Sequence, residues 1–183
     1  MVFHFGPTLS NLKKVDDGLE ATLSNGDVVK TDIVISAIGL RPRTGLAKAA
    51  GLDVNRGIKV NRLLETSAKN VYALGDCAEV DGHVLLYVLP LMAAARALAN
   101  TLVGKPTQVS YPAMPVGVKT PITPLTFHPP IGSQEGQWEY EEEGNNVRAY
   151  FKNANGELLG FVLTGEALSD KAKLTKELPG ILM

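Results

Sequence analysis

The stretch that decides the fold is Thr66-Ser-Ala-Lys-Asn-Val-Tyr-Ala-Leu-Gly-Asp-Cys-Ala78. Within it, Val71–Leu74 is a short apolar run that predicts a buried strand ending in Gly75 and Asp76. Such an ending places a carboxylate at the carboxyl edge of a sheet, beside a glycine that lets a ligand approach the backbone. Ligands of open α/β sheets bind at that edge, so Asp76 is the first candidate binding residue. The alternative is that Asp76 caps a turn.

Two helices are expected around this stretch. Upstream, a short helix at 45–50 is followed by a strand at 58–60. Downstream, a longer helix runs from about Leu89 or Pro90 to Val103, with proline in its first turn and Gly104 as its cap. Its positive amino-terminal end would favour an anionic group beyond the Gly-Asp pair. Apolar residues recur in it at helical spacing and leave two polar positions for solvent or a partner: Leu91, Ala94, Ala95, Leu98 and Leu102, with Arg96 and Asn100.

The first forty residues carry strand patterns. Segments 18–23 and 28–30 flank Ser24-Asn-Gly-Asp27, a turn signal typical of a β-hairpin. The run Ile33–Ile38 is apolar on both faces, which favours a strand covered on two sides, as in a parallel sheet. These patterns predict that the chain opens with sheet structure.

The character of the chain changes after residue 106. Six prolines between Tyr111 and Pro130 prevent a helix there and predict extended segments broken by turns. Strand patterns follow at 137–140, 147–151 and 158–163, with turn residues in both connections, so a three-stranded meander is expected. A short amphipathic helix at 169–178 would close the chain, with Ser169 as its N-cap.

Composition excludes several classes of protein. The chain has 183 residues, 18 Lys and Arg against 19 Asp and Glu, and a formal net charge of −1, so no overall charge draws it to nucleic acid or membrane. The longest apolar run, Val84–Ala95, is too short to span a bilayer. Cys77 is the single cysteine, so no internal disulfide can form, and a cytoplasmic location is expected. The three histidines lack metal-ligand spacing, so no metal site is expected.

Several linked blocks resemble the FAD-dependent pyridine-nucleotide oxidoreductases. Thr66-Ser67 followed by Val71-Tyr-Ala-Leu-Gly-Asp76 resembles the second flavin fingerprint of that family, and Ser36-Ala-Ile-Gly-Leu-Arg-Pro42 and Ala50-Gly-Leu52 precede it in the family's order. The resemblance covers essentially the whole chain. It is strongest to the rubredoxin reductase branch, in five blocks: Arg56-Gly-Ile58, Leu74-Gly-Asp-Cys-Ala-Glu79, Val88-Leu-Pro-Leu-Met92, Met114-Pro-Val-Gly-Val-Lys-Thr-Pro121 and Leu159-Gly-Phe-Val-Leu-Thr-Gly165.

The resemblance implies roles for particular positions. The Asp of the Gly-Asp pair binds the FAD ribityl chain in that family, which points to Asp76 with Gly75 beside it. The backbone at the start of the following helix approaches the flavin pyrimidine edge, which points to Val88, and a lysine approaches the isoalloxazine ring, which points to Lys119. From the residues alone, Lys119 is a cation in a proline-rich loop, and a solvated lysine is the alternative. No side chain of the chain is implied as nucleophile or general base.

Two patterns of a complete family member do not occur here. Such an enzyme has a G-x-G-x-x-G loop for the FAD pyrophosphate and a second for NAD(P)H, because glycine-rich helix starts cradle each pyrophosphate. We therefore expect the C-terminal half of such an enzyme, α/β in class and α+β as a fragment. Residues 1–37 would form the tail of the NAD-binding domain, 38–106 the C-terminal part of the FAD-binding domain, both Rossmann-like, and 107–183 an α+β interface domain with an antiparallel sheet.

The implied function is electron transfer from NAD(P)H through FAD to a one-electron carrier, with rubredoxin as the leading partner. A ferredoxin- or nitrite-reductase-type flavoprotein reductase is the alternative within the class. A non-catalytic apo fragment, or a module that assembles with a separate N-terminal half, is the alternative from another class. Between Arg41 and Arg62, six cations oppose only Asp53, a local balance of +5 that suits an acidic carrier. The other interpretation is an ordinary solvated face with internal ion pairs.

Overall fold

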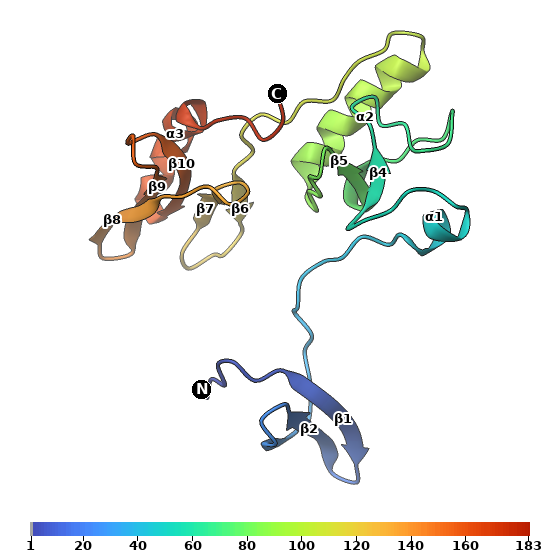
Figure 1. The fold of residues 1–183 in the computed structure, drawn as a ribbon. Coiled ribbons are helices and arrows are strands. Elements are labelled where there is room, and N and C mark those ends of the chain that lie inside the picture. The colour runs from blue at the N-terminus through green and yellow to red at the C-terminus, as the bar shows by residue number, and fades with distance from the viewer. Residues whose placement is uncertain (1) are drawn as a thin grey trace. The chain divides into compact units, whose positions relative to one another are not determined.

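The computed structural model describes residues 2–183. The chain divides into two compact units, Met1–Leu40 and Arg41–Met183, whose elements are drawn in Figure 1. The division into domains at 1–37, 38–106 and 107–183 remains a prediction.

The unit Met1–Leu40 is a small antiparallel sheet. Strands β1 (Leu9–Val15), β2 (Gly18–Leu23) and β3 (Val28–Thr31) pair in that order. The predicted hairpin is confirmed, because β2 pairs with β3 through the turn at 24–27. In that turn the Asp27 N–H donates to Asn25 Oδ1 at 3.1 Å and Gly26 adopts a φ of +90°, which is the local chemistry that reverses the chain.

The predicted two-faced strand at 33–38 is wrong in this structure. Segment 33–38 forms no strand, and its side chains face solvent: Ile33 is 73% exposed, Ile35 85% and Ile38 89%. A strand needs neighbours that satisfy its N–H and C=O groups. No other segment among residues 2–183 pairs with this one. The apolar pattern alone therefore does not make a strand here, because no described segment offers 33–38 a hydrogen-bonding partner.

A short parallel pair organises the start of the second unit. Helix α1 (Gly45–Ala49) confirms the predicted short helix. Strand β4 (Ile58–Val60), also predicted, pairs in parallel with β5 (Ala78–Val80), so that Ile58 lies opposite Ala78. Side chains from both strands enter the central core, since Val60 and Val80 are buried there.

The predicted strand at Val71–Leu74 is wrong. This segment makes one β-bridge, between Tyr72 and Glu65, and leads into a single 3-10 turn, η1 (Gly75–Cys77). The paired strand, β5, follows the Gly-Asp pair instead of preceding it, because β4 takes β5 as its partner. Asp76 therefore precedes a paired strand and does not stand at its carboxyl edge.

Helix α2 (Val88–Leu102) confirms the long helix expected from sequence. Its end is a Schellman arrangement: the Gly104 N–H donates to the Thr101 carbonyl at 3.1 Å, and the Lys105 N–H donates to the Asn100 carbonyl at 2.9 Å. The apolar stripe is only partly as predicted. Leu102 is 63% exposed because it lies at the last turn, past the side chains that reach the core: Pro90, Ala94, Ala97 and Leu98.

The C-terminal part is a five-stranded antiparallel sheet. Its strands pair in the order β6-β7-β10-β9-β8, and their bounds are β6 (Val116–Val118), β7 (Leu125–His128), β8 (Gln137–Glu143), β9 (Asn146–Lys152) and β10 (Leu158–Thr164). The predicted meander is confirmed as β8-β9-β10, and the proline-rich segment contributes β6 and β7. The sequence therefore predicts the strands where turn residues separate them.

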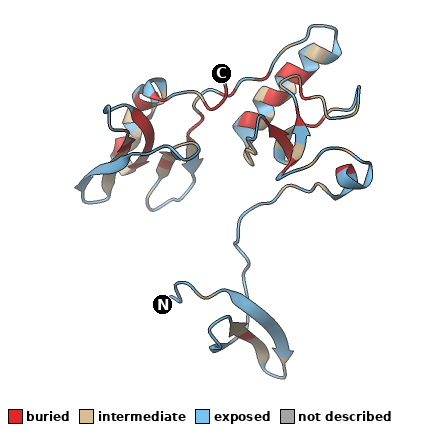
Figure 2. Cartoon of the chain, in the orientation of Figure 1, coloured by how far each residue is buried: buried red, intermediate tan, exposed pale blue. Residues whose placement is uncertain are grey.

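A 3-10 turn and a short helix cover one face of this sheet. They are η2 (Gly165–Asp170) and α3 (Lys171–Glu177), and Leu174 packs with the fully buried Phe161 and Leu163. Ser169 as N-cap is wrong: its hydroxyl donates to the Glu166 carbonyl within η2, and Asp170 precedes the helix. Figure 2 shows burial concentrated along α2, β5 and β10, while the first unit is mostly exposed. Among the described residues, no helix combines the length and hydropathy that a membrane crossing requires.

Candidate functional site

The Gly-Asp pair forms a surface turn packed against α2. Leu74 enters η1 in an extended conformation, and Gly75 follows with a φ of +74°, a region that disfavours residues with a Cβ. A Cβ on Gly75 would lie 3.1 Å from Leu91 Cδ1 of α2. Glycine is thus favoured here by the backbone conformation, and the helix leaves only tight room for a side chain.

Asp76 presents an unpaired carboxylate next to that glycine. The residue is exposed, and the structure gives its side chain no hydrogen bond or ion pair with residues 2–183. The alternative in which Asp76 caps a turn therefore has no supporting contact. A free carboxylate offers about four acceptor positions and suits hydroxyl donors of a ligand.

Glu79, which sequence reasoning did not single out, links the residues that follow the turn to segment 55–57. Its side chain is 5% exposed, and it accepts a hydrogen bond from the Gly57 N–H at 2.9 Å and another from Asn55 Nδ2 at 3.0 Å. Burial opposes the charged form, but these bonds, with Arg56 nearby, outweigh it and hold the pKa of Glu79 below its usual value. A Cβ on Gly57 would lie 3.0 Å from the Cys77 carbonyl oxygen, so segments 55–57 and 77–79 are clamped together.

The first turn of α2 lies beside η1. Val88, the first helical residue, is 69% exposed, and Tyr87 before it makes no side-chain cap. The first N–H groups of a helix have no partner within the helix, so this end presents donors and a positive field. Burial raises the pKa of the Tyr87 hydroxyl above its usual value. The structure thus brings two of the predicted sites, Asp76 and Val88, onto neighbouring elements.

Lys119 stands on a different element. It follows β6 in the connection to β7 and is exposed, and no contact joins it to Asp76 or Val88 among the described residues. Cys77 is half-buried, with its Sγ 3.5 Å from the Leu74 carbonyl oxygen.

An apolar cavity of about 270 Å³ lies between the loop before α2 and the C-terminal sheet. Leu85 and Tyr87 line one side, and Val116 and Phe127 line the other. His128, at its rim, is 2% exposed and its Nδ1 has no hydrogen-bond partner. Burial lowers the pKa of His128, so the neutral ring is favoured. Neither the cavity nor this histidine had a signal in the sequence, because both depend on packing between distant segments.

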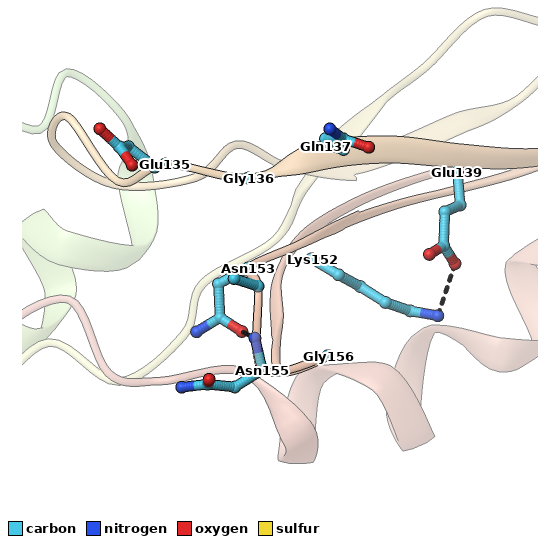
Figure 3. Close-up of a pocket in the computed structure, with 9 residues that line it drawn as sticks. Glu135, Gly136, Gln137, Glu139, Lys152, Asn153, Asn155 and Gly156 are labelled. Atoms are coloured by element: carbon cyan, nitrogen blue, oxygen red, sulfur yellow. Dashed lines mark hydrogen bonds and ion pairs between the residues drawn. The ribbon is translucent and has the colours of Figure 1, made fainter.

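A larger groove, of about 750 Å³, lies along β8, β9 and the turn at 153–156 (Figure 3). Some of its polar groups pair with one another: Lys152 Nζ is 2.7 Å from Glu139 Oε2, and Asn153 Oδ1 accepts from the backbone N–H of Asn155. No three His, Cys, Asp or Glu side chains gather for a metal within residues 2–183.

Two cations of the basic cluster between Arg41 and Arg62 form hydrogen bonds or ion pairs within the chain. Arg62 pairs with Asp81 at 2.8 Å and also donates to the Met183 carbonyl, while Arg56 donates to the Gly82 carbonyl at 2.6 Å. The remaining cations have no ion pair within the described residues: Arg41, Arg43, Lys48 and Lys59. Internal pairing therefore accounts for Arg56 and Arg62, and the role of the other four cations toward a carrier remains a prediction.

Two family models match the chain, one over its first part and one over its last part. Residues 1–103 match the family model "Pyridine nucleotide-disulphide oxidoreductase", and residues 108–178 match "Rubredoxin binding C-terminal domain". The chain is 58% identical to the rubredoxin-NAD(+) reductase of Alcanivorax borkumensis over 98% of its own length and 47% of the relative's. It is 43% identical to the nitric oxide reductase FlRd-NAD(+) reductase of Aliivibrio fischeri over 91% of the chain and 44% of the relative.

The chain spans about half the length of these curated relatives. Among solved structures, the ferredoxin reductase for the CYP199A2 system from Rhodopseudomonas palustris superimposes with a TM-score of 0.80 at 23% identity, over 96% of this chain and 46% of that one. That likeness is one of fold. It confirms the expected class, α/β elements followed by a C-terminal α+β part with an antiparallel sheet.

Proposed function

The chain belongs to the pyridine nucleotide-disulphide oxidoreductase family, and from this premise we propose that it forms part of a flavoprotein reductase. The reductase transfers electrons from NAD(P)H through FAD to a one-electron carrier. The observation that carries the proposal is the exposed, unpaired Asp76 carboxylate on a glycine turn packed against the start of α2. Because the chain spans about half of its relatives, the activity belongs to an assembly that includes the rest of their length.

The groups around η1 fit FAD. When bound, FAD accepts a hydride from NAD(P)H and releases single electrons. Asp76 would accept hydrogen bonds from the ribityl hydroxyls, since its oxygens are free. Gly75 keeps the turn close to α2, and the start of the helix at Val88 would place a positive field near the pyrimidine edge, which favours negative charge there. Lys119 would be the cation near the ring, a role implied by the resemblance. No side chain here acts as nucleophile or general base.

Rubredoxin is the proposed carrier. The model matched by residues 108–178 is described as rubredoxin-binding, and the Alcanivorax relative is named for rubredoxin. The family resemblance implies that rubredoxin is acidic. The four unpaired cations of the Arg41–Arg62 cluster would therefore attract it over long range and speed its binding. We further propose a cytoplasmic location, in keeping with the single cysteine, which can form no internal disulfide.

Two alternatives remain as proposals to be separated by experiment. A ferredoxin-type acceptor would leave the Gly-Asp turn unchanged and alter the C-terminal sheet. A non-catalytic assembly module is favoured by one observation, the absence of a glycine-rich G-x-G-x-x-G loop from the 183 residues. In that case the chain would contribute structure without binding flavin by itself.

The test is carrier reduction by an assembly. The chain is co-expressed with the part of the Alcanivorax borkumensis relative that it does not match, and NADH-dependent reduction of purified rubredoxin and of a ferredoxin is followed. Faster reduction of rubredoxin supports the proposal, and faster reduction of ferredoxin supports the first alternative. An assembly that holds no flavin supports the second alternative.

The same assay tests whether the Arg41–Arg62 cluster attracts the carrier. Rates should fall with added salt, and Lys59→Glu should lower the rate by about tenfold at low salt. Lys13→Glu, on the exposed strand β1, is the matched control and should leave the rate unchanged. A rate that does not depend on salt contradicts steering by the cluster.

A further inference from the structure

The apolar cavity beside His128 is not used by the proposed flavin site. It has a volume of about 270 Å³ and lies within the unit Arg41–Met183, between the loop before α2 and the C-terminal sheet. Tyr87 lines it on the side of the loop, and Phe127 lines it on the side of the sheet. None of the residues proposed to bind flavin lines it. The His128 cavity is therefore separate from the Asp76 turn.

His128 gives this cavity an unsatisfied polar group. Its side chain is 2% exposed, and its Nδ1 has no hydrogen-bond partner within residues 2–183. Buried polar atoms in folded proteins are nearly always hydrogen-bonded, because burial removes the water that would otherwise bind them. Burial also lowers the pKa of His128 and favours the neutral ring, which has one donor and one acceptor nitrogen. An occupant that can both donate and accept would satisfy Nδ1 in either tautomer.

The wall of the His128 cavity restricts the occupant to a small apolar molecule. A water molecule inside a protein makes about three hydrogen bonds, and the side chains of this wall are apolar apart from His128 and Tyr87. An apolar cavity of about 150 Å³ accepts a benzene ring, so the larger His128 cavity has room for a ring with a small substituent. The aromatic side chains of Tyr87 and Phe127 favour an aromatic ring through stacked or edge-to-face contacts.

The His128 cavity has a buried end and a more open side. Met114, His128 and Ile181 are buried, and they form the closed end. Tyr87 is half-buried and Pro129 is exposed, so the opposite side reaches solvent. A small molecule that enters beside Pro129 can therefore place its polar group against the buried histidine.

We propose that the His128 cavity binds a single-ring phenol, whose hydroxyl forms a hydrogen bond with His128 Nδ1 and whose ring lies between Tyr87 and Phe127. A hydroxyl fits because it both donates and accepts, and because an uncharged group is buried at lower cost than a carboxylate or an amine. The phenol contacts both the loop before α2 and the C-terminal sheet, so its binding stabilises the folded chain. This inference goes beyond the proposed function and requires neither flavin nor a carrier.

The hydrogen bond is tested by isothermal titration calorimetry of the purified 183-residue chain with phenol and with toluene. Toluene carries a methyl group in place of the hydroxyl, so the ratio of the two dissociation constants measures the polar contact. We expect saturable phenol binding with a dissociation constant below about 1 mM. His128→Phe should lower the preference for phenol over toluene at least about fivefold, because it keeps a ring and removes the hydrogen bond.

The volume of the cavity is tested by Val116→Phe. Val116 lines the cavity, so the larger side chain should fill it and weaken phenol binding at least about tenfold. Val118→Phe is the matched control, since Val118 lies on the same strand, β6, and does not line the cavity. It should leave the phenol affinity within about twofold. The inference is overturned if phenol binding does not saturate, if His128→Phe leaves the preference unchanged, or if Val118→Phe weakens binding as much as Val116→Phe.

The same titration of the co-expressed assembly separates this inference from the proposed function. Equal phenol affinity in the FAD-loaded and flavin-stripped assemblies supports a cavity that is independent of flavin. Loss of phenol binding when FAD is loaded overturns the inference, because flavin would then occupy the cavity. An assembly that binds phenol but holds no FAD supports the inference and contradicts the proposed function.

Discussion

The two regions matched by different family models differ in how much apolar surface they leave in solvent. Nineteen exposed large hydrophobic residues lie within residues 2–103, and five lie within residues 104–183. The C-terminal region pairs five strands with one another and covers one face with η2 and α3. The first region instead has a three-stranded sheet, a two-stranded pair and an unpaired apolar segment at 33–38.

This difference teaches which parts of the chain are complete as folding units. Antiparallel strands joined by tight turns find their partners nearby in sequence, so the C-terminal region closes its own core. A strand that is apolar on both faces needs neighbours on two sides, and Ile33–Ile38 finds none among the described residues. Phe161, Leu163 and Leu174 should therefore contribute strongly to stability, while the exposed residues of segment 33–38 should contribute little.

The largest effect should follow from Phe161→Ala. Phe161 is fully buried in the core under α3, so the cavity left behind should cost about 3–5 kcal/mol of unfolding free energy. Urea denaturation followed by the fluorescence of Trp138, which packs 5.3 Å from the Phe151 ring in the same sheet, measures it. Ile35→Ala, at a position 85% exposed, is the counterpart and should change stability by less than about 0.5 kcal/mol. Equal losses of unfolding free energy in the two variants would contradict the difference between the two regions.

A smaller effect is expected from Glu79→Ala. Loss of the carboxylate leaves the Gly57 N–H and the Asn55 amide without their acceptor, at a cost of about 2–3 kcal/mol. The wild-type advantage should depend on pH. Because folding lowers the pKa of Glu79, its contribution is full above the usual carboxyl range and is lost as pH falls through the folded value.

Urea denaturation at pH 7, 5 and 3 checks this, with Glu79→Gln as the variant that keeps the shape and removes the charge. The wild type should lose stability relative to Glu79→Gln between about pH 5 and 3. A constant difference across that range would mean that the carboxylate charge does not hold the clamp.

The smallest effect should come from His128. Folding lowers the pKa of this buried ring, so the unfolded chain takes up the proton first as pH falls below the usual histidine value. Stability should therefore drop by on the order of 1 kcal/mol between pH 7 and 5, and His128→Asn should remove that slope. Trp138 fluorescence in urea reports it, with His4→Asn, in the exposed N-terminal unit, as control. A slope that survives in His128→Asn would place its origin elsewhere.

Local sequence signals predicted the elements that local chemistry builds. The hairpin at 24–27 depends on Asn25 and Gly26, and α2 depends on Pro90 and Gly104, so each could be located from its own residues. The strands at 33–38 and 71–74 could not be placed in the same way. A strand forms only where a neighbouring strand pairs with its backbone groups, and β4 pairs with β5 instead of with segment 71–74.

Some residues of the candidate site could likewise be found from local sequence, and others could not. Asp76 was accessible to sequence reasoning because a glycine and an acidic residue stand together after an apolar run. Glu79 was not, since a glutamate in a short strand is typical of an exposed position, and its burial depends on Gly57 from a segment 22 residues away. Only folding brings that donor to the carboxylate, and only packing creates the cavity beside His128.

The measurement that tests the central claim most directly is the flavin content of the co-expressed assembly with wild-type, Asp76→Ala and Asp53→Ala chains. Asp53 is an exposed carboxylate outside the turn and serves as control. We predict about one FAD per assembly for the wild type and Asp53→Ala, and about a tenth of that for Asp76→Ala, because hydrogen bonds to a charged acceptor are lost. Full flavin content in Asp76→Ala would contradict the account.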